Sequence, residues 1–226
     1  MGHTEKGLRV LVHGAIGKMG QQVLSTLCSE VDMCPVGAVD SRAVGDKLDL
    51  PDMSGAIPLS SNIEPILEQT RPMVVVDFTN SSGALRAARA CASYNVHFVS
   101  GSTGFAAQDM NEIRTLIGET TLGFLFAPNF AMGAVVLMYL AQLAARHFEF
   151  AEVNEAHHEA KIDAPSGFAM ALAQSLGNDK EFTRNETSKE NLENTRGGEY
   201  NGITIHSIRM PGRSAHHEII MGAPGQ

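Results

Sequence analysis

The sequence has few cysteines and no segment with the length of a membrane span. Its 226 residues include three cysteines, whose spacing fits neither a metal motif nor a disulfide framework. Reduced thiols are typical of the cytoplasm, so we expect a cytoplasmic protein. No apolar run reaches the roughly 20 residues that cross a bilayer. The segment 1–10 also lacks the apolar core of a secretory signal.

Positive charge is also scarce. Lysine and arginine number 17 against 25 acidic residues, giving a net charge of -8. This balance argues against nucleic acid and anionic membranes as partners. A composition that is 43% hydrophobic and 19% charged is ordinary for a globular protein, and the length allows one large domain or two small ones.

The first half of the chain alternates short apolar runs with helical patterns. We expect strands over 8–13, 35–40, 73–77, 96–100 and 122–127, and helices over 18–29, 83–94 and 108–118. Strands that alternate with helices indicate a parallel sheet covered on both faces, an α/β fold.

The pattern changes after Asn129. Helices are expected over 131–147 and 165–176, and strands over 150–156, 202–209 and 217–221. The second half is therefore predicted to be α+β. We expect a dinucleotide-binding domain over 1–129 and a substrate-binding and oligomerisation domain over 130–226.

The motif "HGAIGKMG" places Gly14, Gly17 and Gly20 between a predicted strand and a predicted helix. Glycines permit a tight turn and let a pyrophosphate approach the amides of the helix N-terminus. Asp40 ends the next strand at the distance at which a carboxylate binds the ribose hydroxyls of a nicotinamide cofactor. Arg42 could instead meet a 2′-phosphate, so NADPH and NADH both remain open. The alternative is a turn that needs glycine for packing alone.

Two further loops follow predicted strands, "GSTGF" at 101–105 and "APNF" at 127–130. Ligands of parallel sheets bind at the C-terminal ends of the strands. These loops are therefore candidates for holding the nicotinamide, although either could be an ordinary turn.

The tetrapeptide AHHE occurs twice, and the first copy runs on as "AHHEAKIDAPSGF". His157 can exchange protons near neutral pH, and Lys161 supplies a cation and a proton. The amides of Ser166 and Gly167, at the start of a helix, can receive a carboxylate. Together they suit a small anionic substrate that accepts a hydride and a proton. Surface histidines, a solvated lysine and a capped helix are the alternative.

A metal site at the first copy is disfavoured. Consecutive side chains on a strand point to opposite faces, so His157 and His158 do not easily share one ion. We therefore expect no metal.

The motifs "GAIGKMG", "VVVDFT", "GSTGF", "APNF" and above all "EAHHEAKIDAPSG" resemble those of dihydrodipicolinate reductase, also called 4-hydroxy-tetrahydrodipicolinate reductase, an enzyme of the diaminopimelate route to lysine. The resemblance covers almost the whole chain. It implies a Rossmann-like cofactor domain, an α+β substrate domain, NADPH or NADH as cofactor, a small anionic cyclic imine as substrate and a homotetramer.

The resemblance also implies roles for single residues. His157 and Lys161 match the catalytic pair of the family. Substrate-binding positions match His158, Lys161, Ser166, Gly167 and Phe168. Cofactor-binding positions match Gly14, Ala15, Ile16, Gly17, Lys18, Met19, Asp40, Gly101, Ser102, Thr103, Ala127, Pro128, Asn129 and Phe130.

The chain departs from the family pattern at three places. Lys18 stands where arginine is usual, and Phe168 stands where threonine is usual. A threonine hydroxyl there would help to bind a substrate carboxylate. The family's chain also returns to the first domain with a final strand and helix, and we expect that return to be missing because the sequence ends at Gln226.

The second copy, Ala215–Glu218, has no lysine four residues later and no helix after it. It lies in a stretch similar to "RLPG…AHQE" of the family. We expect a structural or interface role for it and no catalytic one.

Two other functions remain open beside the reductase. Phe168 could mark a related nicotinamide-dependent reductase with an altered substrate. The shortened end could leave a cofactor-binding protein without activity.

Overall fold

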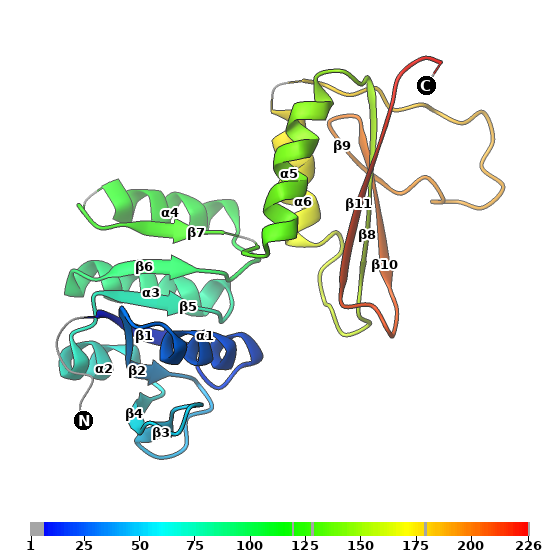
Figure 1. Cartoon of the computed structure of the whole chain (residues 1–226). Helices are drawn as coiled ribbons and strands as arrows, with labels where there is room; N and C mark the ends of the chain where they lie inside the picture. The colour runs from blue at the N-terminus through cyan, green and yellow to red at the C-terminus, as the bar shows by residue number, and fades with distance from the viewer. Residues whose placement is uncertain (1–6, 119, 128, 179, 226) are drawn as a thin grey trace. The chain divides into compact units, whose positions relative to one another are not determined.

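The computed structural model describes residues 7–118, 120–127, 129–178 and 180–225 (Figure 1). Contacts divide the chain into two compact units, Met1–Ala127 and Pro128–Gln226. The first unit holds a seven-stranded sheet and the second a four-stranded sheet, so the predicted α/β class is confirmed. Among the described residues, none of the helices combines the length and hydropathy that crossing a bilayer requires.

The sheet of the first unit has the strand order β3-β4-β2-β1-β5-β6-β7. All its strand pairs are parallel except β3 with β4. Its strands are β1 (Leu8–His13), β2 (Met33–Val39), β3 (Lys47–Asp49), β4 (Ala56–Ser60), β5 (Val74–Asp77), β6 (His97–Ser100) and β7 (Phe124–Phe126). Its helices are α1 (Lys18–Ser29), α2 (Ile63–Thr70), α3 (Ser81–Tyr94) and α4 (Ala107–Gly118).

Both faces of this sheet are covered, as the alternation of β1 shows. Leu11 belongs to a core with residues of α2 and α3. Val10 and Val12 belong to a second core with Leu24 and Leu27 of α1. Since neighbouring side chains of a strand point to opposite faces, the two cores lie on opposite sides of the sheet. The apolar run of β1 therefore reflects a strand buried on both faces.

The second unit has the strand order β11-β8-β10-β9. Here β10 runs parallel to β8, whereas β11 is antiparallel to it. The elements are α5 (Met132–Ala145), β8 (Phe150–His157), α6 (Gly167–Gly177), β9 (Gly198–Tyr200), β10 (Ile203–Arg209) and β11 (Ala215–Gly222). The two helices pack on the sheet over a core that includes Val153, Leu172 and Ile203.

The predicted helices and strands are all present, with ends that shift by a few residues. The first residue of one helix differs from the prediction for a physical reason. α6 begins at Gly167 and not at Pro165, because the hydroxyl of Ser166 caps the helix and accepts from Ala169 N at 3.2 Å. The sequence patterns also missed β3, β4, α2 and β9.

A buried carboxylate joins the strand ends of the first unit. Asp77, at the end of β5, is fully buried and accepts hydrogen bonds of 2.7 Å from the hydroxyls of Thr79, Ser100 and Ser102. Nδ1 of His13, at the end of β1, lies 2.9 Å from Oδ1 of Asp77. Burial alone would raise the pKa of Asp77, but its hydrogen bonds together lower it. The carboxylate thus stays ionised and holds three adjacent strand ends.

We expect Asp77→Asn to destabilise the first unit by about 2–4 kcal/mol, because an amide places a donor among groups that donate. Hydrogen exchange of β5 and β6 amides measures this change. The exposed Asp46→Asn is the matched control. Because the folded pKa of Asp77 is lowered, its contribution is present above about pH 4 and is lost as pH falls through the folded pKa. Equal protection in the two variants would contradict this role.

Candidate active site

The glycine turn between β1 and α1 is shaped by its first and third glycines. Gly14 has a φ of +84°, and a Cβ there would lie 2.6 Å from the carbonyl oxygen of Phe78. A Cβ on Gly20 would lie 2.1 Å from the Gly14 oxygen. Gly17 has an ordinary φ of -71°, and its Cβ would approach the same oxygen at 3.2 Å, which a small shift relieves. The fold requires glycine at 14 and 20, whereas a Cβ at Gly17 would need only a small shift and would lie 3.6 Å from Nη2 of Arg42.

The N-terminus of α1 fits a phosphate. Gly17 is the N-cap and has no side chain to bond the first-turn amides. That turn holds Lys18 and no acidic residue. Free amides and the positive end of the helix dipole attract an anion. The predicted cofactor residues Gly14, Ala15, Ile16, Gly17, Lys18 and Met19 all lie in this turn and first helical residues.

Asp40 lies beside this turn at the end of β2 and is 4% exposed. Its carboxylate accepts from the backbone N of Ile16 at 2.9 Å and from Arg42 Nε at 3.0 Å. Burial alone would raise the pKa of Asp40, but the hydrogen bonds from Arg42 and Ile16 lower it. Arg42, whose side chain is 62% exposed, thus neutralises this carboxylate. The pair offers a negative oxygen and a cation at one place.

The loop after β6 is held in place by hydrogen bonds to the side chain of Ser102. Ser102 is buried, and its hydroxyl donates to Asp77 and accepts from the backbone N of Thr79 at 3.0 Å. A Cβ on Gly101 would enter the Phe78 ring. The Ser102 side chain is therefore committed to the fold, which leaves the loop backbone and Thr103 for a cofactor.

The predicted "APNF" segment crosses the boundary between the two units. Ala127 donates its N–H to the Ser100 oxygen at 3.0 Å in the first unit. In the second unit, Asn129 Oδ1 accepts from Ala131 N at 2.8 Å, and Phe130 is 46% exposed. Pro128 lies outside the described residues.

In the second unit, a buried carboxylate orients the first histidine. Glu155 and His157 lie on one face of β8, and Nδ1 of His157 hydrogen-bonds Oε2 of Glu155. Oε1 of Glu155 accepts from Arg209 Nη2 at 2.8 Å and from Ser166 N at 3.3 Å. Burial alone would raise the pKa of Glu155, but hydrogen bonds from Arg209, Ser207 and His157 lower it. Because a carboxylate only accepts, Nδ1 of His157 carries a proton and Nε2 is left for chemistry.

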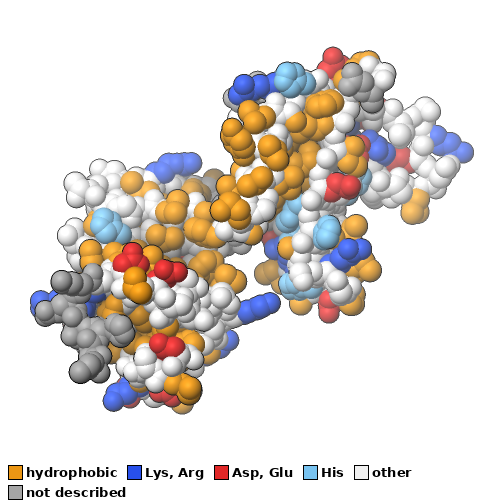
Figure 2. Space-filling model, viewed as in Figure 1, with side chains coloured by type: hydrophobic (Ala, Val, Ile, Leu, Met, Phe, Trp, Pro, Cys, Tyr) orange, Lys and Arg blue, Asp and Glu red, His pale blue; other side chains and the backbone are white. Residues whose placement is uncertain are grey.

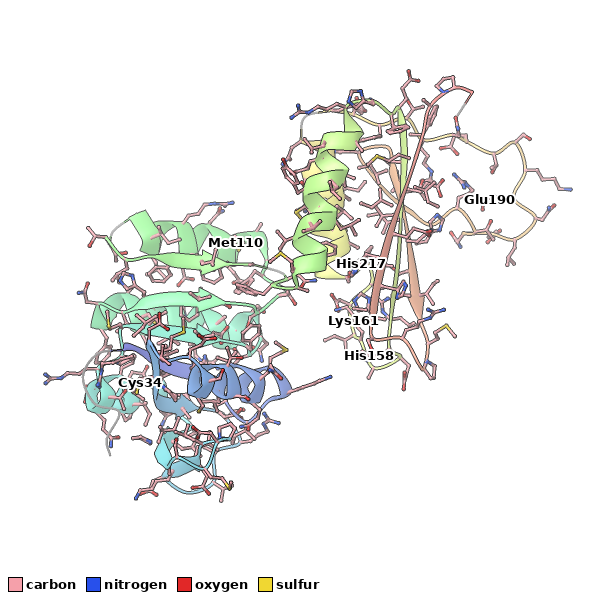
Figure 3. The ribbon with its side chains drawn as sticks, in the orientation of Figure 1. Cys34, Met110, His158, Lys161, Glu190 and His217 are labelled. Atoms are coloured by element: carbon pink, nitrogen blue, oxygen red, sulfur yellow. The ribbon has the colours of Figure 1, made fainter. Side chains whose placement is uncertain are left out.

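Lys161 follows in the loop before α6 (Figure 3). Its Nζ donates to Asp163 Oδ1 at 2.6 Å. Burial alone would raise the pKa of Asp163, but Lys161 and the backbone of Gly167 lower it by hydrogen bonding. An ammonium and a helix-start amide thus meet on one carboxylate. His158 comes directly after β8 and is exposed, so it faces away from the buried Glu155.

The second AHHE lies against the first. In the pairing of β11 with β8, Ala215 is opposite His157 and His217 is opposite Glu155. The ring of His217 packs edge-on against His157, with centroids 5.3 Å apart, and against the buried Phe168 at 4.6 Å. Burial, with a smaller contribution from His157, lowers the pKa of His217 to about 4. His217 is therefore neutral at pH 7 and shapes the wall behind His157.

Several residues of this site were missed from the sequence. Glu155 could have been found, because it lies two residues before His157 on a strand and so shares its face. Arg209 and His217 are brought in by the pairing of β10 and β11 with β8, for which the local sequence carries no signal.

Comparison with known proteins gives the family of the chain. Residues 8–130 match the family described as dihydrodipicolinate reductase, N-terminus, and residues 133–226 match its C-terminus. A 4-hydroxy-tetrahydrodipicolinate reductase of Dehalococcoides mccartyi is 47% identical over 97% of this chain and 83% of its own length. One of Desulfitobacterium hafniense is 40% identical over 98% and 85%.

A solved structure shares the fold. The dipicolinate-bound dihydrodipicolinate reductase of Paenisporosarcina sp. TG-14 is 36% identical, with a TM-score of 0.78 over 97% of this chain and 85% of that chain. The identity of these relatives and the two matched family segments lead to one conclusion. The chain belongs to the dihydrodipicolinate reductase family.

Proposed function

We propose that His157 and Lys161 are the catalytic residues with which this chain reduces 4-hydroxy-tetrahydrodipicolinate. The chain is an NAD(P)H-dependent oxidoreductase of lysine biosynthesis, as its family and its curated relatives indicate. The observation that carries the residue roles is the His157 ring, held by the buried Glu155 with Nε2 left for the substrate.

The first unit binds the cofactor. The glycine turn Gly14–Met19 receives the pyrophosphate, and Asp40 with Arg42 receives the adenosine ribose. Because Arg42 neutralises Asp40, the pair suits both a free ribose hydroxyl and a 2′-phosphate. Support for NADPH and NADH is therefore equal. The loop Gly101–Thr103 and the segment Ala127–Phe130 are the remaining candidates. A bound nicotinamide supplies the hydride.

The second unit binds the anionic imine. Lys161 and the Gly167 amide already share the carboxylate of Asp163, so they are chemically fit for a substrate carboxylate in its place. His158 and the backbone of Phe168 are the further substrate-binding candidates. Ser166, which was also predicted, instead donates its N–H to Glu155 and caps α6 with its hydroxyl. Cations placed to meet the carboxylates of a small anionic substrate both strengthen its binding and fix its orientation.

His157 and Lys161 move the proton that accompanies the hydride. Glu155 keeps the imidazole in one orientation, with the Nδ1 proton on the side of the carboxylate. Lys161 is held by Asp163 until a substrate carboxylate takes that place. The proton passes from Lys161, or from His157 with it, to the substrate.

A homotetramer in the cytoplasm completes the proposal. Figure 2 shows hydrophobic side chains gathered over α5, where Met132, Tyr139 and Leu140 are each more than half exposed. Such an apolar face favours association of the second units with further copies of the chain. The three cysteines are free thiols, which supports the reducing cytoplasm.

We expect His157→Ala and Lys161→Ala each to lower kcat by roughly 10²- to 10⁴-fold, because each removes a proton-transfer group. Steady-state oxidation of NADPH with the imine measures this loss. His216→Ala is the matched control, since it removes an exposed imidazole of the second AHHE. Near-normal turnover in either site variant would contradict the assigned roles.

Gly17→Ala is expected to keep the fold and to weaken NADPH binding at least about tenfold, because a methyl group there crowds Arg42 and the turn that is proposed to receive the pyrophosphate. Fluorescence titration with NADPH and thermal unfolding separate the two effects. Gly20→Ala serves as the contrast and should lower the melting temperature, because its Cβ collides with Gly14. Unchanged NADPH affinity in Gly17→Ala would overturn the cofactor site.

Phe168 favours a second candidate, a reductase of the same kind for a related imine. The residue lacks the hydroxyl usual at this position, and its ring is buried against His217. We expect Phe168→Thr to bind the lysine-pathway imine more tightly and to lower its KM about tenfold, the worth of one hydrogen bond to a charged group. Phe168→Leu keeps an apolar side chain and is the control. The same KM in both variants would show that Phe168 does not weaken binding of this imine and would contradict the second candidate.

A further inference from the structure

The two AHHE copies bring three metal-ligating side chains together. One carboxylate oxygen of Glu155 and one ring nitrogen each of His157 and His217 lie within 4.8 Å of one another. Glu155 and His157 share one face of β8, and His217 faces them from β11, where it is directly opposite Glu155. Pairing of the two strands therefore fixes all three ligands.

These groups have the chemistry of a transition-metal site. Two imidazoles and a carboxylate are ligands of Zn²⁺ and of its neighbours in the first transition series. The other oxygen of Glu155 is held by Arg209 at 2.8 Å and by Ser166 N at 3.3 Å. Such outer hydrogen bonds orient a ligating carboxylate. The side chains of Glu155 and His157 are 0% and 10% exposed, so these two ligands are shielded from water, whereas His217 is partly buried.

We propose that Glu155, His157 and His217 form a site for a divalent transition ion such as Zn²⁺, and that the bound ion inhibits the enzyme. The ion takes the place of the Nδ1 proton between Glu155 and His157 and releases that proton to water, which breaks the hydrogen bond that orients the ring for the substrate. This inhibition rests on the proposed role of His157, whereas the binding itself does not.

Two cations oppose the ion. Arg209 contacts Glu155, and Lys161 acts on His217 through its charge. They weaken binding of the ion, as expected of a regulatory site more than of a permanent one.

The matched variants are His217→Gln and His216→Gln. Each removes one imidazole from β11, but His216 is exposed and, as the neighbour of His217, points to the opposite face of the strand. Full-length protein freed of metal is titrated with Zn²⁺ by calorimetry, and Co²⁺ serves as an absorbing probe of the ligand set. NADPH oxidation is followed in parallel at buffered free Zn²⁺.

We expect wild type and His216→Gln to bind one Zn²⁺ per chain and to lose activity over the same Zn²⁺ range. His217→Gln should shift both binding and half-inhibition to at least about tenfold higher Zn²⁺. Equal shifts in the two variants, or no saturable binding in wild type, would overturn the site. Binding without inhibition would overturn the regulatory role. A protein that has no activity but still binds Zn²⁺ through His217 would contradict the proposed function and support the metal site.

If thermal unfolding shows that His217→Gln is misfolded, His217→Asn replaces it in both titrations. Retention of wild-type Zn²⁺ affinity in the folded variant contradicts the proposal.

Discussion

The second unit is organised around one buried charge, the carboxylate of Glu155. It lies on the central strand β8 and has no exposed surface. A buried ion is costly unless it is paired and hydrogen-bonded, and here Arg209, Ser166 and His157 bind the carboxylate. These partners come from β10, from the start of α6 and from β8 itself. One ion thus locks together three elements and the orientation of the reactive ring.

The first unit repeats the same physical solution with different partners. Asp77 is fully buried at the end of β5 and draws hydroxyl groups from the neighbouring strand end and loops. It also holds the loop after β6 through Ser102. In both units, a buried carboxylate near the end of a strand holds a neighbouring loop in one conformation through hydrogen bonds. Loops fixed in this way present backbone amides in a constant position, which binding sites need.

Sequence reasoning reached the fold class and the strands because β1 and β5 are buried on both faces and read as continuous apolar runs. It missed β3, a short edge strand whose three residues give no period. Within the site, His157 and Lys161 belong to one uninterrupted motif and could be named. Arg209 follows Glu155 after 54 residues and meets it only through strand pairing, so a linear pattern could not place it. The buried state of Phe168 likewise depends on packing that the sequence does not display.

The antiparallel pairing of the second AHHE with the segment 154–157 creates a question of register. A slip of β11 by one residue would offer His216 in place of His217, so the paired letters alone barely distinguish the two alignments. The residues that follow the second AHHE in β11 select between the two alignments. Ile219 and Met221 pack against the core, whereas Ile220 between them is half exposed. A slip would turn those two side chains out to water, so the apolar end of β11 fixes which histidine faces Glu155.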